Sequence, residues 1–131
     1  MSGLITGLYA AAIGLLVVGL GLRVVQLRRR YRVGIGDGDH RELARAIRAH
    51  GNLIEHAPLA LVLLLIAELS HALSGPALHA AGAAIVVGRL LHAAGLSRTA
   101  APSHGRLVGM LLTWGAMLAL ALSLLARPWP A

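Results

Sequence analysis

Hydrophobic residues in this chain form long runs that are separated by short polar segments. Met1–Leu22 contains no charged residue, and Leu107–Ala126 is equally apolar. A helix needs about 20 apolar residues to cross the roughly 30 Å of hydrocarbon in a bilayer. The pattern therefore predicts a first membrane span over residues 3–24 and a last one over residues 107–126.

Two further spans are expected between these runs. Residues 76–96 are apolar except for Arg89 and His92. The uncharged core His56–Ala67 makes only about 18 Å of helix, so it crosses the bilayer only if the helix continues at both ends, over residues 41–73. We expect a single domain, residues 1–131, with an all-α fold: a polytopic membrane four-helix bundle.

Composition supports a membrane protein. Of 131 residues, 57% are hydrophobic and 13% are charged. Soluble domains carry about 25% charged residues, and disordered chains are polar, so neither class fits. The chain has no cysteine, which excludes disulfides, thiolate metal sites and a cysteine nucleophile.

The charge distribution predicts an orientation. All twelve basic residues are arginine, and most lie between Arg23 and Arg48, in and around the first connection. Arg98 and Arg106 lie in the third connection, whereas the second connection and the N-terminal tail carry no arginine. This is the positive-inside pattern, and it argues against nucleic acid as a partner. We expect a multi-pass protein of a bacterial cytoplasmic membrane, with the first and third loops cytoplasmic and both termini outside.

Smaller patterns predict local structure. Gly7, Gly14 and Gly21 share a seven-residue spacing, which is typical of a helix face packed closely on a protein neighbour. Asp39 followed by Glu42 predicts a capping box at the start of the second helix. Trp129 predicts an anchor in the headgroup region, since tryptophan is enriched at membrane interfaces.

A polar stripe on the second helix is the strongest functional signal. Its members are spaced by three or four residues, which places them on one helical face, with His56 at the edge: Arg41, Arg45, Arg48, Asn52 and Glu55. Ionisable groups at membrane depth usually face the bundle interior. On the third helix, Arg89 and His92 lie one turn apart and add to this polar interior.

Three simpler readings of these residues stay open. The arginines can be interfacial residues whose guanidinium groups extend into the headgroups. Glu55 can form an internal ion pair with Arg48 or Arg89. A haem held by His56 and His92 is a weaker alternative, and no histidine spacing indicates another metal site, so no metal is expected.

Several arginines, an amide and a carboxylate match a small zwitterionic peptide with two carboxylates and one amine. Arginine binds carboxylates through paired hydrogen bonds, and a buried glutamate favours an ammonium partner. Glutathione has these groups. A neighbouring arginine would also lower the pKa of its thiol and increase the reactive thiolate.

The segment from Arg45 to Pro58 resembles the second-helix signature of the MAPEG superfamily, the membrane-associated proteins of eicosanoid and glutathione metabolism. The shared pattern is R-x-x-R-x-x-x-N-x-x-E followed by a proline. Arg28–Val33 resembles the basic end of the family's first helix, and Gly88–His92 resembles the third-helix segment of the prostaglandin E synthase branch.

The resemblance implies a homotrimer with glutathione, as co-substrate, bound between subunits near the cytoplasmic side. It implies that Arg45, Arg48, Asn52 and Glu55 hold the peptide. Arg28 would contribute from a neighbouring first helix, His92 would form the cleft wall, and His56 and Arg89 belong to the same binding set. Arg106 is the best match to the arginine that activates the thiol.

Two departures from the family bear on activity. His56 replaces an aromatic residue, and Leu96 replaces the tyrosine that the family usually carries. The expected function is a glutathione-dependent transferase or peroxidase that presents a thiolate to a lipophilic small molecule in the membrane lipid. The alternative is a non-catalytic structural or small-ligand-binding protein. A four-span drug exporter fits less well, because the first span has no acid.

Overall fold

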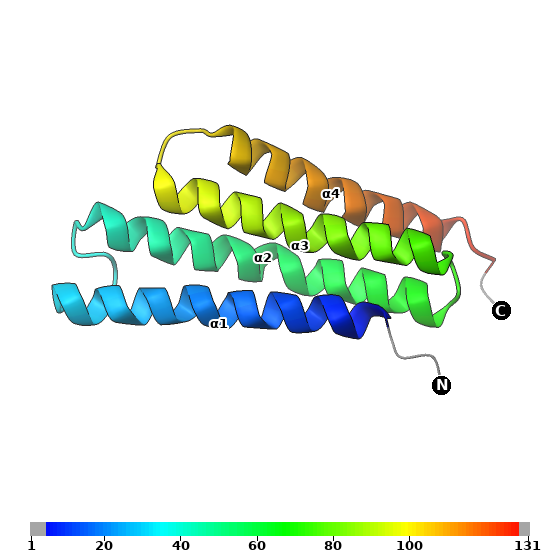
Figure 1. Ribbon diagram of the computed structural model, residues 1–131, viewed down its shortest axis with the longest axis horizontal. Coiled ribbons are helices and arrows are strands. Elements are labelled where there is room, and N and C mark those ends of the chain that lie inside the picture. Colours follow the sequence, from blue (N-terminus) through cyan, green and yellow to red (C-terminus); the bar gives the residue numbers. More distant parts are fainter. Residues whose placement is uncertain (1–4, 129–131) are drawn as a thin grey trace.

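The computed structural model describes residues 5–128, which form four helices packed side by side as one bundle (Figure 1). They are α1 (Ile5–Tyr31), α2 (Arg41–Leu69), α3 (Gly75–Arg98) and α4 (His104–Leu125). Each is long and apolar enough to cross a membrane. The all-α, four-span prediction is confirmed, whereas the predicted anchor Trp129 lies outside the described residues.

Two helices differ from the expected spans at their ends. Helix α1 continues past residue 24 to Tyr31, so its last turn carries Arg28, Arg29 and Arg30. These cations suit the negative end of the helix dipole. Helix α2 ends at Leu69 instead of residue 73, because His71 adopts a left-handed conformation with φ of 54°.

The core lies along one face of α2. Small residues alternate there with leucine at three- and four-residue spacing: Leu43, Ala46, Ala49, Leu53, Ala57, Ala60, Leu64 and Ala67 are all buried. The alanines let neighbouring backbones approach closely, as membrane helices require. Helix α1 packs against α2 and α3 on one side, and α4 packs against them on the other (Figure 1).

The closest helix approach is between α3 and α4. A Cβ added to Gly109 would lie 2.5 Å from the Gly88 carbonyl oxygen, and one added to Gly88 would lie 2.8 Å from the Gly109 carbonyl oxygen. Only glycine fits at both positions. Of the first-helix glycines, Gly21 contacts α2, since an added Cβ would lie 3.5 Å from the His50 ring, whereas Gly7 and Gly14 have nothing within 4 Å of an added Cβ in this single chain.

Glu68, near the end of α2, fixes the start of α1. Its carboxylate accepts hydrogen bonds from the backbone N–H groups of Ile5 and Thr6, the latter at 2.8 Å. The first amides of a helix have no partner within the helix, and a carboxylate there also favours the positive end of the dipole. One side chain thus joins two spans at the end of the bundle opposite the first loop (Figure 1).

The predicted capping box at the start of α2 is wrong. His40 occupies the N-cap without a side-chain cap, and Asp39 has φ of 63°. Glu42 instead accepts a hydrogen bond from the Tyr31 hydroxyl at 2.8 Å and lies 3.7 Å from the Arg23 guanidinium. Glu42 turns toward α1 because a cationic and a hydroxyl partner are present there.

Candidate functional site

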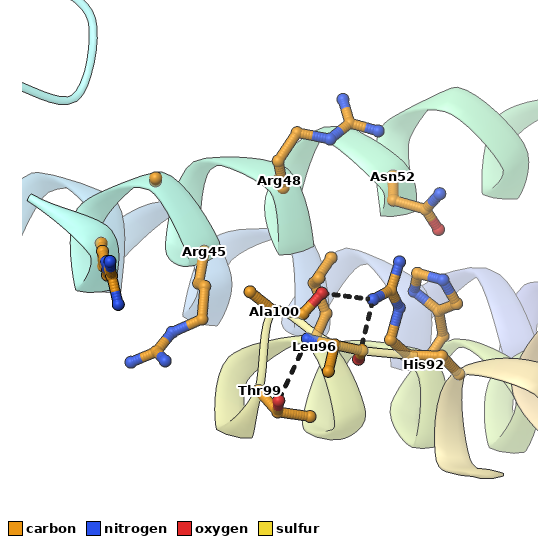
Figure 2. A pocket seen from close by; sticks show the side chains of 11 residues that line it. Arg45, Arg48, Asn52, His92, Leu96, Thr99 and Ala100 are labelled. Carbon is orange, nitrogen blue, oxygen red and sulfur yellow. Dashed lines mark hydrogen bonds between the residues drawn. The ribbon is translucent and has the colours of Figure 1, made fainter. Parts of the chain in front are cut away.

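A cavity of about 650 Å³ opens between α2 and the connection from α3 to α4 (Figure 2). Its walls come from four segments: Arg41, Ala44, Arg45, Arg48 and Asn52 of α2, His92 and Leu96 of α3, Thr99 to Ala101 of the connection, and Arg106 of α4. Four arginines and no acid line it. The cavity therefore has a positive potential and attracts anions.

Helix periodicity brings the arginines of α2 to this cavity. Arg45 and Arg48 project from successive turns of α2, and Asn52 lies across from His92 on α3 (Figure 2). The Arg45 Nε atom is buried and has no hydrogen-bond partner within residues 5–128. A buried donor without a partner is costly, so this atom indicates a place for an acceptor.

Glu55 lies just outside the cavity lining and pairs with Arg48, whose Nη1 donates to Glu55 Oε1 at 3.2 Å. Of the two partners considered from the sequence, Arg48 is therefore the one found. The pair is not internal, since the two side chains are 60% and 50% exposed in the single chain. It stands on the face of α2 that no other helix of this chain covers.

Arg89 lies beneath the cavity, not in its wall, and is 1% exposed. Its Nη1 donates to Asn52 Oδ1 at 2.7 Å, its Nε to Thr113 Oγ1 at 2.9 Å, and its Nη2 to the Gly109 carbonyl at 3.2 Å. The possible ion pair with Glu55 is not formed. Arg89 instead ties α2, α3 and α4 together, and the Gly88–Gly109 approach brings that carbonyl within reach.

The bond from Arg89 fixes the orientation of Asn52. An amide has one oxygen that accepts and one nitrogen that donates. Because the oxygen accepts from Arg89, the nitrogen with its two hydrogens is left for the cavity. Asn52 therefore adds donors to a wall that already consists of arginine donors, and the buried positive charge of Arg89 lies directly behind it.

The two histidines near Asn52, His92 and His56, differ in their relation to the cavity. His92 lines the cavity and is buried. His56 does not line the cavity: its Nδ1 lies 3.0 Å from the Asn52 carbonyl oxygen, and its ring centroid is 6.3 Å from that of Trp114. Within residues 5–128, no three histidine, cysteine or acidic side chains gather closely enough to hold a metal ion.

Arg106 closes the cavity from the α4 side. Its Nη1 donates to the carbonyl oxygens of Ala100 and Ala101, each at 3.1 Å. Ser103 caps α4 by accepting from the Arg106 backbone N–H at 3.4 Å. The connection thus holds one nitrogen of the guanidinium, whereas Nε and Nη2 have no hydrogen bond to another described residue.

Arg28 lies apart from this cavity. Its Nη1 donates to the Gly36 carbonyl at 2.9 Å and to the Val33 carbonyl at 3.4 Å, so it supports the first loop. Within one chain the structure therefore brings together Arg45, Arg48, Asn52, His92 and Arg106. Glu55, His56 and Arg89 are their direct neighbours, and Arg28 is separate.

Sequence reasoning assigned the members of the site incompletely. Arg41 is included in the polar stripe but not in the expected peptide-binding set, and it lines the cavity. Leu96 stands in the wall where the resemblance expects a tyrosine. Thr113, which accepts from Arg89, sits in an apolar run and is recognisable only by its register with Gly109, four residues earlier.

Four spans around an arginine-lined cavity define a polytopic membrane protein with an anion-attracting site at one end of its bundle. A family comparison gives the class a name: the MAPEG family model matches residues 6–126, and the chain belongs to that family. It is 39% identical over 132 residues to inner membrane protein YecN of Escherichia coli K12, covering 96% of this chain and 95% of the relative. The YecN protein of Escherichia coli O6:H1 matches to the same extent. The chain is a multi-pass protein of the cytoplasmic membrane.

Proposed function

We propose that this protein binds glutathione in the cavity beside α2 and presents its thiolate to a lipophilic electrophile from the bilayer. The observation that carries the proposal is the composition of the wall: four arginines, no acid, and the buried Arg45 Nε without a partner. A cavity of this size is typical of small-molecule sites, which range over about 300–1,000 Å³.

The groups of glutathione match the donors around the cavity. Its two carboxylates suit Arg45, Arg48 and the amide nitrogen of Asn52, since guanidinium and amide donors bind carboxylates well. Its amine suits Glu55, the one acid beside the wall. His92 contributes wall surface. Arg89 and His56 act through Asn52, whose oxygen and backbone carbonyl they respectively engage.

Arg106 is the residue proposed to activate the thiol. A cation close to a thiol favours the thiolate, which is the nucleophile. Because loop carbonyls occupy Nη1, the remaining Nε and Nη2 donors are held in a defined orientation. The thiolate would attack an electrophilic carbon, forming a thioether as the carbon's bond to its leaving group breaks. With a hydroperoxide it would attack the terminal oxygen and break the O–O bond, giving glutathione sulfenic acid and an alcohol, and a second glutathione would convert the sulfenic acid to the disulfide and water.

We also propose that the protein assembles as a homotrimer, as its family resemblance implies. The exposed Arg48–Glu55 pair supports an assembly, since charged groups within a span are unfavourable against lipid and usually face protein. A second subunit on this face would also bring an Arg28 from another first helix toward the site. We propose that the first and third connections lie in the cytoplasm, and the arginines that they carry support this orientation.

Calorimetry on the detergent-purified protein tests glutathione binding. Arg45→Met removes the unpartnered donor, and Arg98→Met is the matched control, because Arg98 carries the same charge but lies outside the cavity. We expect saturable binding that Arg45→Met weakens by at least about tenfold, equivalent to one lost charged hydrogen bond, and that Arg98→Met leaves unchanged. Equal weakening in both variants would show only a general charge effect and would refute the site.

The second candidate function is ligand binding without turnover, and one observation favours it. Leu96 stands in the wall, Thr99 is the lining residue that carries a hydroxyl, and no tyrosine of the same chain lines the cavity to assist the thiol. A panel of lipophilic electrophiles and hydroperoxides separates the two functions. Turnover that Arg106→Met abolishes, with glutathione affinity kept, supports the enzyme; saturable binding with no turnover across the panel supports the binding protein.

A further inference from the structure

The outward face of α1 carries a continuous stripe of side chains, none of which lines the cavity proposed to bind glutathione. The stripe has three- and four-residue spacing and every member is exposed: Leu15, Val18, Leu22, Val25, Arg29 and, just past the helix end, Arg32. Its first four members are apolar and its last two are cationic. This face therefore has the polarity of an amphiphile, with its charged end at the first loop.

A pocket of about 340 Å³ lies at the cationic end of this stripe, lined by Val25, Arg28, Arg29, Arg32, Val33 and Gly34. Its shape comes from the way the chain leaves α1. Arg32 adopts φ of 56°, and the Val33 N–H donates to the Arg28 carbonyl at 3.0 Å. Arg28 then holds the loop by donating to the Gly36 carbonyl at 2.9 Å. The pocket is thus part of the fold of the first connection.

The arginines of this pocket have no acidic partner. Between residues 5 and 128 the ion pairs are Arg23 with Glu42 and Arg48 with Glu55, so none involves Arg28, Arg29 or Arg32. Asp37, an acid of the same loop, accepts from the backbone N–H of Asp39 at 3.1 Å. Unpaired guanidinium groups at a membrane surface attract anionic headgroups.

We propose that this stripe and pocket bind an anionic phospholipid. The headgroup phosphate accepts hydrogen bonds from Arg29 and Arg32, for which the guanidinium fork is well suited. One acyl chain lies along Val25, Leu22 and Val18. From Leu15 to Val25 the helix rises about 15 Å, which is half of the roughly 30 Å hydrocarbon thickness and hence the depth of one leaflet.

We propose a phospholipid as the ligand because it contacts both the apolar half and the cationic half of the stripe. Inorganic phosphate would use the arginines but not the apolar half. A zwitterionic phospholipid would use the apolar half, but its own ammonium compensates the phosphate and reduces the attraction. The site uses no residue that lines the cavity between α2, α3 and α4. It shares Arg28 with the contact between subunits proposed above, so its test varies Arg29, Arg32 and Leu22 and leaves Arg28 in place.

Native mass spectrometry of the detergent-purified full chain measures this binding directly. The probes are palmitoyl-oleoyl phosphatidylglycerol and phosphatidylcholine with the same acyl chains. The test variant is Arg29→Gln with Arg32→Gln. The matched control is Arg30→Gln with Arg98→Gln, which removes the same charge from two exposed arginines outside the pocket lining. A third variant, Leu22→Gln, changes the apolar half and leaves the charge unchanged.

We expect wild type to retain phosphatidylglycerol in preference to phosphatidylcholine, with excess inorganic phosphate failing to displace it. The test pair should weaken phosphatidylglycerol binding by at least about tenfold and the control pair by less than about twofold. Leu22→Gln should weaken it by about threefold, which keeps the proposal testable if the double variant misfolds.

Three results would overturn the proposal. Equal losses in the test and control pairs would show nonspecific attraction by the basic end. Displacement by inorganic phosphate, with Leu22→Gln unaffected, would show a phosphate site instead. A change of oligomeric state in the test pair, with no selective lipid loss, would show that this face contacts a second copy of the chain.

Discussion

Replacing Asn52 by aspartate would exchange one amide nitrogen for oxygen and separate fold stability from ligand binding. Asn52 Oδ1 accepts from the buried Arg89 at 2.7 Å, and the amide nitrogen is left for the cavity. The new carboxylate would keep the acceptor that Arg89 needs and would provide this cation with a counterion. On the cavity side it would replace two N–H donors with a negative charge.

The substitution should therefore stabilise the fold and weaken ligand binding. A unit pair with charge centres about 4 Å apart interacts by about 4 kcal/mol at an effective dielectric constant of about 20. Desolvation of the carboxylate offsets much of this attraction. We therefore expect Asn52→Asp to raise the free energy of unfolding by about 0–2 kcal/mol. Asn52→Ala, which removes the acceptor, should lose about 1.5–3 kcal/mol, the usual contribution of a hydrogen bond to a charged group.

Ligand binding should fall in both variants, and more in the aspartate. Repulsion between the new carboxylate and a glutathione carboxylate about 5 Å away amounts to about 3 kcal/mol at the same dielectric constant, or at least roughly a hundredfold in Kd. Stability is measured as the unfolding midpoint in detergent, followed by the circular dichroism of the helices, and affinity is measured by calorimetry. If Asn52→Asp destabilises the protein as much as Asn52→Ala, the Arg89–Asn52 link is refuted. If it binds glutathione like wild type, Asn52 does not face the ligand.

Two further substitutions test the packing that supports the site. Gly109→Ala should lower stability by about 1–3 kcal/mol, because its Cβ would lie 2.5 Å from the Gly88 carbonyl; Gly115→Ala, with open space at its Cβ, should be neutral or slightly stabilising in the same unfolding assay. Equal effects of the two alanines would contradict the close approach of α3 and α4. Glu68→Gln should speed hydrogen exchange of the first two described amides of α1 by about tenfold or more, because a charged acceptor is lost. Unchanged exchange would show that Glu68 does not hold the start of α1.

The long apolar runs and the helical spacing of polar residues in the sequence predict the fold well. Apolar runs identify all four helices, because only a helix satisfies its backbone hydrogen bonds within one segment in a bilayer. The stripe on α2 also predicts which side chains share a face, since a spacing of three and four residues fixes direction around a helix. Arg45, Arg48 and Asn52 line one cavity, as that periodicity predicts.

Partners across helices could not be predicted in the same way. Arg89 and Glu55 have compatible charges and similar expected depth, yet Arg89 bonds to Asn52, Thr113 and Gly109. The choice depends on the rotation of α3 relative to α2 and on the close approach of α3 to α4, which one-dimensional spacing does not contain. Glu42 shows the same limit: its spacing from Asp39 suits a cap, but Tyr31 and Arg23 of the neighbouring helix are its partners.

The way Arg106 is held bears on what a missing tyrosine means for activity. A side chain activates a thiol only if its donors are already oriented, because ordering a flexible guanidinium during the reaction costs free energy. In this chain the Ala100 and Ala101 carbonyls supply that orientation from the backbone, so it does not depend on the side chain at position 96. Leu96 therefore removes a hydroxyl from the wall without releasing Arg106. Under the proposed enzymatic function, turnover would depend on the α3–α4 connection that holds the arginine. Changes in that connection should then affect turnover before they affect glutathione affinity.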